Sequence, residues 1–211
     1  VARDANFLGF AEAVANTALA AKVQDVAALL ALPLAGQSMT VEEARQTLVA
    51  KIGENINVRR IVLTNASSGS IGTYLHSGRI GVLVELDVDN QDLAKDIAMH
   101  IAASKPLVIS QEDVPNELVA KEKEIYMAQA STSGKPQEII EKMVNGKLKK
   151  FMDEVSLLGQ SFVKDPEVVV SSLLGKNRAK VISFTRFEVG EGIEKESEDF
   201  VEAVMAQVHG N

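Results

Sequence analysis

The sequence predicts an α+β fold in which helices outnumber three or four strands. Apolar residues recur every three or four positions in several segments, which is typical of helices with one buried face. Two segments, 80–88 and 180–189, carry the branched, alternating pattern of strands. A segment rich in Lys and Glu, residues 115–158, has almost no strand signal and predicts further helices.

The composition is that of a globular chain of 211 residues, 46% hydrophobic and 24% charged. Such a length suits one large domain or two small ones. Aromatic residues make up only 4% and Trp is absent, so we expect an aliphatic core. The chain has no Cys, which excludes disulfides, thiolate zinc sites and cysteine nucleophiles.

The charge and the hydropathy of the chain limit the kinds of partner and the cellular compartment that we expect. The net charge is −7, whereas general nucleic-acid binders more often carry a positive charge. No apolar run approaches the roughly 20 residues needed to span a bilayer, and no signal peptide is visible. We therefore expect a cytoplasmic protein that binds neither a membrane nor nucleic acid directly.

The N-terminal part predicts two helices. Phe7, Phe10 and Val14 lie at the spacing of one helical face, and the segment 32–36 interrupts that helix.

A capping box at Thr40 opens the second helix. The Thr40 hydroxyl can accept from the third helical amide, while Glu43 reaches back to the amide of the cap. Gly53 is the predicted stop. The buried stripe of this helix comprises Ala44, Leu48 and Ile52.

A β region followed by a helix is predicted next. Val58–Thr64 is rich in branched residues, and Asn65–Gly72 has the Ser, Gly and Asn content of a loop. Ile80–Val88 alternates as a strand does. Asn90 can then cap a helix over residues 91–103.

Residues 115–158 predict two helices joined by a turn at Ser131–Pro136. The apolar residues of the second helix recur about every 3.5 positions; they are Ile140, Val144, Leu148, Phe151, Val155 and Leu158. Two helices joined in this way form an antiparallel hairpin. The pattern alone supports a protruding arm and two ordinary helices lying on the core about equally.

The C-terminal part predicts a short helix, a strand and a last helix. Asp165–Glu167 has the cap, proline and acid of a helix start, and the expected helix, Val168–Leu174, ends at Gly175. Lys180–Val189 is the expected strand. A last amphipathic helix uses Phe200, Val201, Val204, Met205 and Val208.

Motifs for catalysis or for metal and phosphate binding are missing. His76, His100 and His209 fit no metal-ligand spacing, and for His100, on a helix next to apolar residues, we expect a packed or a surface role rather than a ligand role. Ser161–Lys164 matches an S-x-x-K spacing by chance, since its companion motifs are absent. We therefore expect no catalytic residue, cofactor or metal, and a binding or regulatory protein rather than an enzyme.

Six blocks of sequence, in order along the chain, resemble the bacterial elongation factor Ts family. The last of them contains Arg-Phe-Glu-Val-Gly-Glu-Gly, and together they occupy residues 50–60, 79–84, 97–106, 134–136, 154–160 and 186–194. Six ordered matches over nearly the whole chain are far more specific than any short motif. The resemblance implies a translation elongation factor that acts as the guanine-nucleotide exchange factor of elongation factor Tu.

The resemblance also implies a division of the chain. Residues 1–108 match an incomplete N-terminal part of the core, 109–157 a coiled-coil or dimerisation arm, 158–192 the C-terminal part of the core, and 193–211 a C-terminal module. The fold class becomes α+β with helices packed on small antiparallel sheets, a protruding antiparallel helical hairpin and a C-terminal helix. The stretch Ala27–Gly36 is interpreted as a loop insertion.

By resemblance, the protein binds EF-Tu·GDP and promotes GDP release by disturbing the magnesium and phosphate site. The G domain and the region reached by the core and the C-terminal helix are the expected contacts, and the arm is the expected surface for a homodimer. Family contact positions match Ile52, Gly53, His76 and Val163. Taken alone, Ile52 is a core residue, Gly53 a helix stop and His76 an exposed loop residue.

The chain begins with Val1, which matches the position after an Asp-Phe pair that in this family disturbs the magnesium site. We expect a fragment that lacks this pair and the N-terminal domain, and therefore binds elongation factor Tu but exchanges nucleotide poorly. The alternative is a structural subunit or scaffold, together with elongation factor Tu, in a larger assembly such as a phage RNA replicase.

Overall fold

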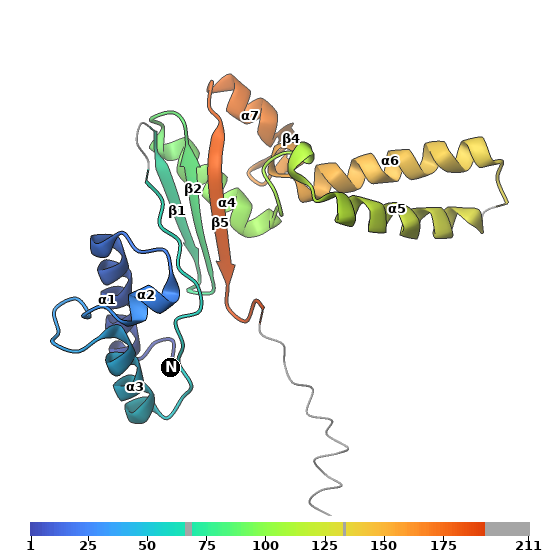
Figure 1. The fold of residues 1–211 in the computed structure, drawn as a ribbon. Coiled ribbons are helices and arrows are strands. Elements are labelled where there is room, and N and C mark those ends of the chain that lie inside the picture. Colours follow the sequence, from blue (N-terminus) through green and yellow to red (C-terminus); the bar gives the residue numbers. More distant parts are fainter. Residues whose placement is uncertain (66–68, 133, 193–211) are drawn as a thin grey trace, which may run out of the picture. The chain divides into compact units, whose positions relative to one another are not determined.

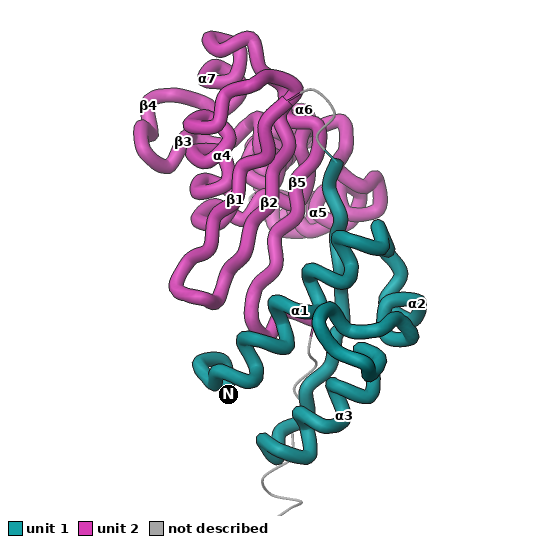
Figure 2. The backbone as a smooth tube through the Cα atoms, turned by 90° about the vertical axis from the view of Figure 1, so that its left-hand side faces the viewer, with its two compact units in different colours: residues 1–67 teal, residues 68–211 magenta. Residues whose placement is uncertain are grey.

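A computed structural model describes residues 1–65, 69–132 and 134–192 of the chain. The chain divides into two compact units, residues 1–67 and 68–211 (Figure 2). Each has its own hydrophobic core. Helices combined with two small antiparallel sheets confirm the predicted α+β class. The predicted last helix lies outside the described residues.

The first unit is built from three helices, α1 (Ala5–Ala21), α2 (Val26–Leu30) and α3 (Val41–Ile52). Asp4 caps α1 by accepting from the amides of Asn6 and Phe7. The core of this unit is aliphatic apart from one Phe, as the composition predicts; its buried members are Phe10, Val14, Ala18, Leu29, Leu34, Val41, Ala44, Leu48 and Ile56.

The capping box of α3 is confirmed. The Glu43 amide donates to the Thr40 hydroxyl oxygen at 3.2 Å, and the Thr40 amide donates to the Glu43 carboxylate at 2.7 Å. Hydrogen bonds from the amide and hydroxyl of Thr40 hold the pKa of Glu43 below its usual value, since they favour the ionised carboxylate.

The loop predicted over Ala27–Gly36 is wrong. The segment contains most of α2, and the side chains of Leu29 and Leu34 are fully buried. The amide of Ala35 donates to the Thr17 hydroxyl of α1 at 2.9 Å. The Ala/Leu/Pro composition that looked like an insertion therefore supplies part of the core of the first unit.

The strand predicted over Val58–Thr64 is also wrong, because this segment has no regular secondary structure and belongs to neither sheet. Branched residues favour a strand only where a neighbouring strand is available to pair with. Here Ile56 is buried in the core of the first unit, and Val58 and Ile61 pack against it.

The second unit contains a three-stranded antiparallel sheet in the order β1 (Ile71–His76), β2 (Ile80–Leu86) and β5 (Val181–Glu188). The strands predicted over 80–88 and 180–189 are confirmed as β2 and β5. Sequence analysis missed β1, whose first two residues fell in the expected loop 65–72.

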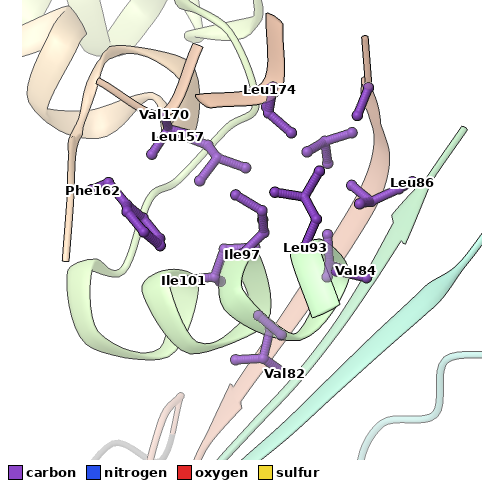
Figure 3. Packing of buried hydrophobic residues seen from close by; sticks show 14 of the residues in the cluster. Val82, Val84, Leu86, Leu93, Ile97, Ile101, Leu157, Phe162, Val170 and Leu174 are labelled. Atoms are coloured by element: carbon purple, nitrogen blue, oxygen red, sulfur yellow. The ribbon is translucent and has the colours of Figure 1, made fainter. Parts of the chain in front are cut away.

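Helix α4 (Gln91–Ser104) covers one face of this sheet, and Asn90 caps it as predicted. Residues from β2, α4, β5 and the segment 157–174 form one core that is aliphatic apart from Phe162 (Figure 3). Gly72 of β1 lies so close to α4 that a Cβ there would overlap the backbone carbonyl of Ala94. The contact needs glycine at this position.

The helical hairpin is confirmed. After the 3-10 turn η1 (Gln111–Asp113), α5 (Asn116–Ser131) and α6 (Gln137–Val155) run side by side and extend away from the sheet (Figure 1). We call this hairpin the arm. Its buried seam consists of Ala130, Ile140 and Val144.

Beyond the arm lie a 3-10 turn η2 (Leu157–Gly159), a two-stranded sheet of β3 (Ser161–Phe162) and β4 (Asp165–Val169), and helix α7 (Val170–Lys176). The helix predicted over 168–174 therefore begins at Val170, two residues later than expected. Its expected cap, Asp165–Glu167, lies in strand β4. The cap signature is overridden because β4 pairs with β3.

Candidate docking surface

The structure places the four predicted contact residues in two separate units. Ile52 and Gly53 lie at the end of α3 in the first unit, while His76 and Val163 belong to the second. Each pair is therefore described within its own unit.

Local structure accounts for both residues of the first pair. Ile52 is half-buried and packs against the core of the first unit. Gly53 caps the C-terminus of α3 at φ +78°, a left-handed conformation that favours glycine, and its amide donates to the Val49 carbonyl at 2.8 Å. The predicted helix stop is confirmed.

In the second unit, His76 and Val163 line the same pocket although they are far apart in sequence. His76 is the last residue of β1 rather than a loop residue, and Val163 follows β3. The pocket has a volume of about 520 Å³. Lys164, next to Val163 in the turn between β3 and β4, also lines it, and strands β1 and β2, helix α4 and strand β5 supply the rest of its wall: Tyr74, Ile80, Met99, Ala102, Ala103 and Arg186.

The rim of this pocket combines apolar and polar groups. The Val163 side chain is 43% exposed, which leaves an apolar surface open to a partner. The His76 ring is also exposed, and its Nδ1 lies 3.1 Å from the hydroxyl oxygen of Tyr74. Lys164 forms an ion pair of 2.5 Å with Asp96 of α4.

Arg186 forms the buried polar part of the wall, with a side chain only 9% exposed. Its Nη1 donates to Glu188 at 2.8 Å and its Nη2 to the Ala102 carbonyl at 3.4 Å. The hydrogen bond from Arg186 is the largest cause that lowers the pKa of Glu188, and Lys105 contributes less. Among the described residues, the Arg186 Nε has no hydrogen-bond partner.

A buried histidine that sequence analysis did not connect with the site lies behind Val163. His100 of α4 is fully buried, which decides between the packed and the surface role that the sequence left open, and its Nδ1 accepts from the Val163 amide at 3.1 Å. Only the tertiary structure reveals this contact, because a helical histidine and a turn amide 63 positions away share no sequence signal.

The arrangement suits noncovalent docking. Over residues 1–65, 69–132 and 134–192, no group of three or more His, Asp or Glu side chains could hold a metal ion. No helix in the described parts of the chain is both long enough and apolar enough to cross a membrane. The surface instead offers an exposed valine and an exposed imidazole beside a pocket with mostly apolar walls.

Comparison with known proteins identifies a family. The model of the family described as elongation factor TS matches residues 1–191. Elongation factor Ts of Coxiella burnetii (strain RSA 493) is 56% identical over all of this chain and 71% of the relative. The factors of Legionella pneumophila (strain Philadelphia 1) and Alkalilimnicola ehrlichii are 57% and 53% identical, with 99% and 100% of this chain and 70% and 72% of each relative covered.

Proposed function

The chain belongs to the elongation factor Ts family of translation elongation factors, and on that premise we propose that it is a guanine-nucleotide exchange factor for elongation factor Tu. In this proposal it binds EF-Tu·GDP and promotes GDP release by disturbing the magnesium and phosphate site. The protein acts by protein–protein binding and makes or breaks no covalent bond. The G domain is the main contact.

The observation that carries the proposal is the meeting of His76 and Val163 at one pocket. Both positions were assigned to contact with elongation factor Tu from the family resemblance alone. Their convergence supports that assignment, because two unrelated surface residues have no reason to share a rim. Ile52 and Gly53 belong to the proposal as a second contact patch on the first unit.

Exchange requires that the factor binds the nucleotide-free partner more tightly than the GDP-bound partner. GDP is held chiefly through its phosphates and the associated magnesium ion, so a small displacement of either weakens it strongly. A rim that presents Val163 and His76 can bury apolar surface and form a hydrogen bond in the displaced state. Those contacts would offset the lost nucleotide contacts.

We also propose a functional division that differs from the two compact units: core parts at 1–108 and 158–192, the arm at 109–157, and a C-terminal module at 193–211. In this division the core and the C-terminal module contact elongation factor Tu.

Stopped-flow release of a fluorescent GDP from elongation factor Tu tests the proposal, together with a direct measurement of binding. We expect this chain to bind, and His76→Ala to weaken binding about fivefold, as for an interface residue worth about 1 kcal/mol. Any acceleration of GDP release should fall in the same proportion.

The matched control is Lys176→Ala, on the last turn of α7. Helix α7 comes just before the first residue of β5. His76 lies at the other end of the sheet, because its partner Ile80 pairs with the last residue of β5. The control should bind as the wild type does. Lack of binding by the wild-type chain, or an equal loss in both variants, would contradict the proposed docking surface.

A homodimer through the arm is a further part of the proposal. Ile125 of α5 and Ile139 of α6 are exposed apolar side chains that a second arm could cover. Sedimentation velocity should show a dimer that dissociates in the double variant Ile125→Glu/Ile139→Glu, because burying two charges opposes association. A wild-type monomer at high concentration would contradict this part alone.

A further inference from the structure

His100 is a buried polar residue that packing alone does not explain. It lies on the face of α4 that meets the core, among aliphatic side chains, with its ring fully buried. An apolar side chain would fill such a place without the cost of burying two ring nitrogens. Both nitrogens have specific partners.

The partners determine the state of the ring. Nδ1 accepts from the Val163 amide at 3.1 Å, so the proton of a neutral ring resides on Nε2. Nε2 then donates to the side-chain oxygen of Gln160 at 2.9 Å. The amide nitrogen of Gln160 points the other way, which fixes the orientation of this side chain.

Gln160 extends the chain of hydrogen bonds to the base of the arm. Its Nε2 donates to the Glu154 carbonyl in the last turn of α6 at 2.7 Å and to the Ser104 carbonyl of α4 at 3.4 Å. A continuous path of hydrogen bonds therefore runs from the base of the arm through Gln160 and His100 to the backbone amide of Val163.

We propose that His100 is a positioning residue that holds Val163 at the rim of the docking pocket and couples this rim to the base of the arm. The inference rests on the proposed function, because it assigns His100 a role in docking through Val163. Without the Nδ1 acceptor, the part-buried amide of Val163 loses its partner. The turn that carries Val163 is then joined to α4 by the ion pair of Lys164 with Asp96 but no longer by this hydrogen bond.

The surroundings of the ring make this link sensitive to pH. Besides Gln160, the ring faces the Ser104 hydroxyl, 3.5 Å from Nδ1, and the Phe162 ring, whose centroid lies 5.9 Å away. Asp96 of α4 and Lys164, next to Val163, form an ion pair. Burial lowers the pKa of His100 below its usual value, so the ring is neutral near pH 7. Protonation at lower pH places a proton on Nδ1 and removes the acceptor.

Two variants of similar size distinguish the role of Nδ1 from the role of Nε2. His100→Asn places an amide oxygen near the position of Nδ1 and can still accept from Val163, whereas His100→Gln places its amide near Nε2. We expect His100→Asn to bind elongation factor Tu within about twofold of the wild type, and His100→Gln about fivefold to tenfold more weakly. Thermal unfolding should shift by similar amounts in both.

The pH profile is the second measurement and needs only folded protein. As the pH is lowered from about 7.5 for as long as the protein stays folded, affinity of the wild type should fall relative to that of His100→Asn, whose amide does not titrate. A ratio that stays constant with pH overturns the inference.

The remaining outcomes are also decisive. Equal binding by wild type, His100→Asn and His100→Gln overturns the inference and leaves the proposed function intact. Losses of binding that only follow the fraction of unfolded protein, equally for both variants, assign His100 a structural role and overturn it too. A wild-type chain that does not bind elongation factor Tu overturns the proposed function and the inference together.

Discussion

The sheet core of the second unit and the arm are stabilised in different ways. The core gathers buried residues from six elements that are distant in sequence. The arm joins two consecutive helices through a seam of three buried residues. Its ion pair between Glu138 and Lys142 is exposed, and such pairs contribute little to stability. The core is therefore a cooperative structure, whereas the arm is local and thin.

This difference bears on docking. The walls of the pocket belong to β1, β2, α4 and β5, which the core holds in place, and to the turn between β3 and β4, which carries Val163 and Lys164. The arm meets that core near the residues that follow α6, where Ser156 and Leu157 are buried. The helices of the arm can thus separate while the pocket stays intact. The hydrogen bonds of Gln160 are the exception, because they connect the arm to the pocket.

The largest expected effect is the difference between an Ile→Ala substitution in the core and the same substitution in the arm. Ile97→Ala in α4 should cost about 4 kcal/mol of global unfolding free energy, because a fully buried side chain leaves a cavity among fixed neighbours. Ile140→Ala in the arm should cost about 2 kcal/mol and act locally, because the thin seam can collapse or open. Chemical denaturation and amide hydrogen exchange measure the two effects.

Faster exchange confined to α5 and α6 in Ile140→Ala would support a separately opening arm. Uniformly faster exchange across the second unit in that variant would show instead that the arm and the core unfold together.

A smaller effect, opposite in sign between the two regions, is expected for glycine replacements. Gly72→Ala should destabilise the protein by about 3 kcal/mol, because the new Cβ overlaps the Ala94 backbone carbonyl. Gly146→Ala within α6 should stabilise the arm by about 0.5–1 kcal/mol, because nothing lies within 4 Å of the new Cβ and alanine favours the helix. Thermal unfolding of the two variants and exchange rates in α6 give the comparison.

Should Gly146→Ala slow exchange in α6 but leave the global midpoint unchanged, the arm is confirmed as an independent local structure. A destabilising effect of Gly146→Ala would contradict the open surface assigned to that position.

Local signals in the sequence predicted much of this fold. The capping box of Thr40 and Glu43, the stop at Gly53, the cap at Asn90 and the hairpin of α5 and α6 depend on contacts between residues close in sequence. The failures have the opposite origin. Val58–Thr64 has a strand composition without a paired strand, and Asp165–Glu167 has a helix-start signature but pairs with β3.

For the candidate site, the sequence by itself determined which residues to consider, because the family resemblance carried by the six ordered blocks matched contact positions to His76 and Val163, which lie outside those blocks. Only the tertiary structure decided that these two share a pocket while Ile52 and Gly53 lie in another unit. It also decided that His100 holds the Val163 amide. The physical reason is that helix caps and hairpins arise from neighbouring residues, whereas a pocket arises from the packing of distant segments, whose partners no local pattern encodes.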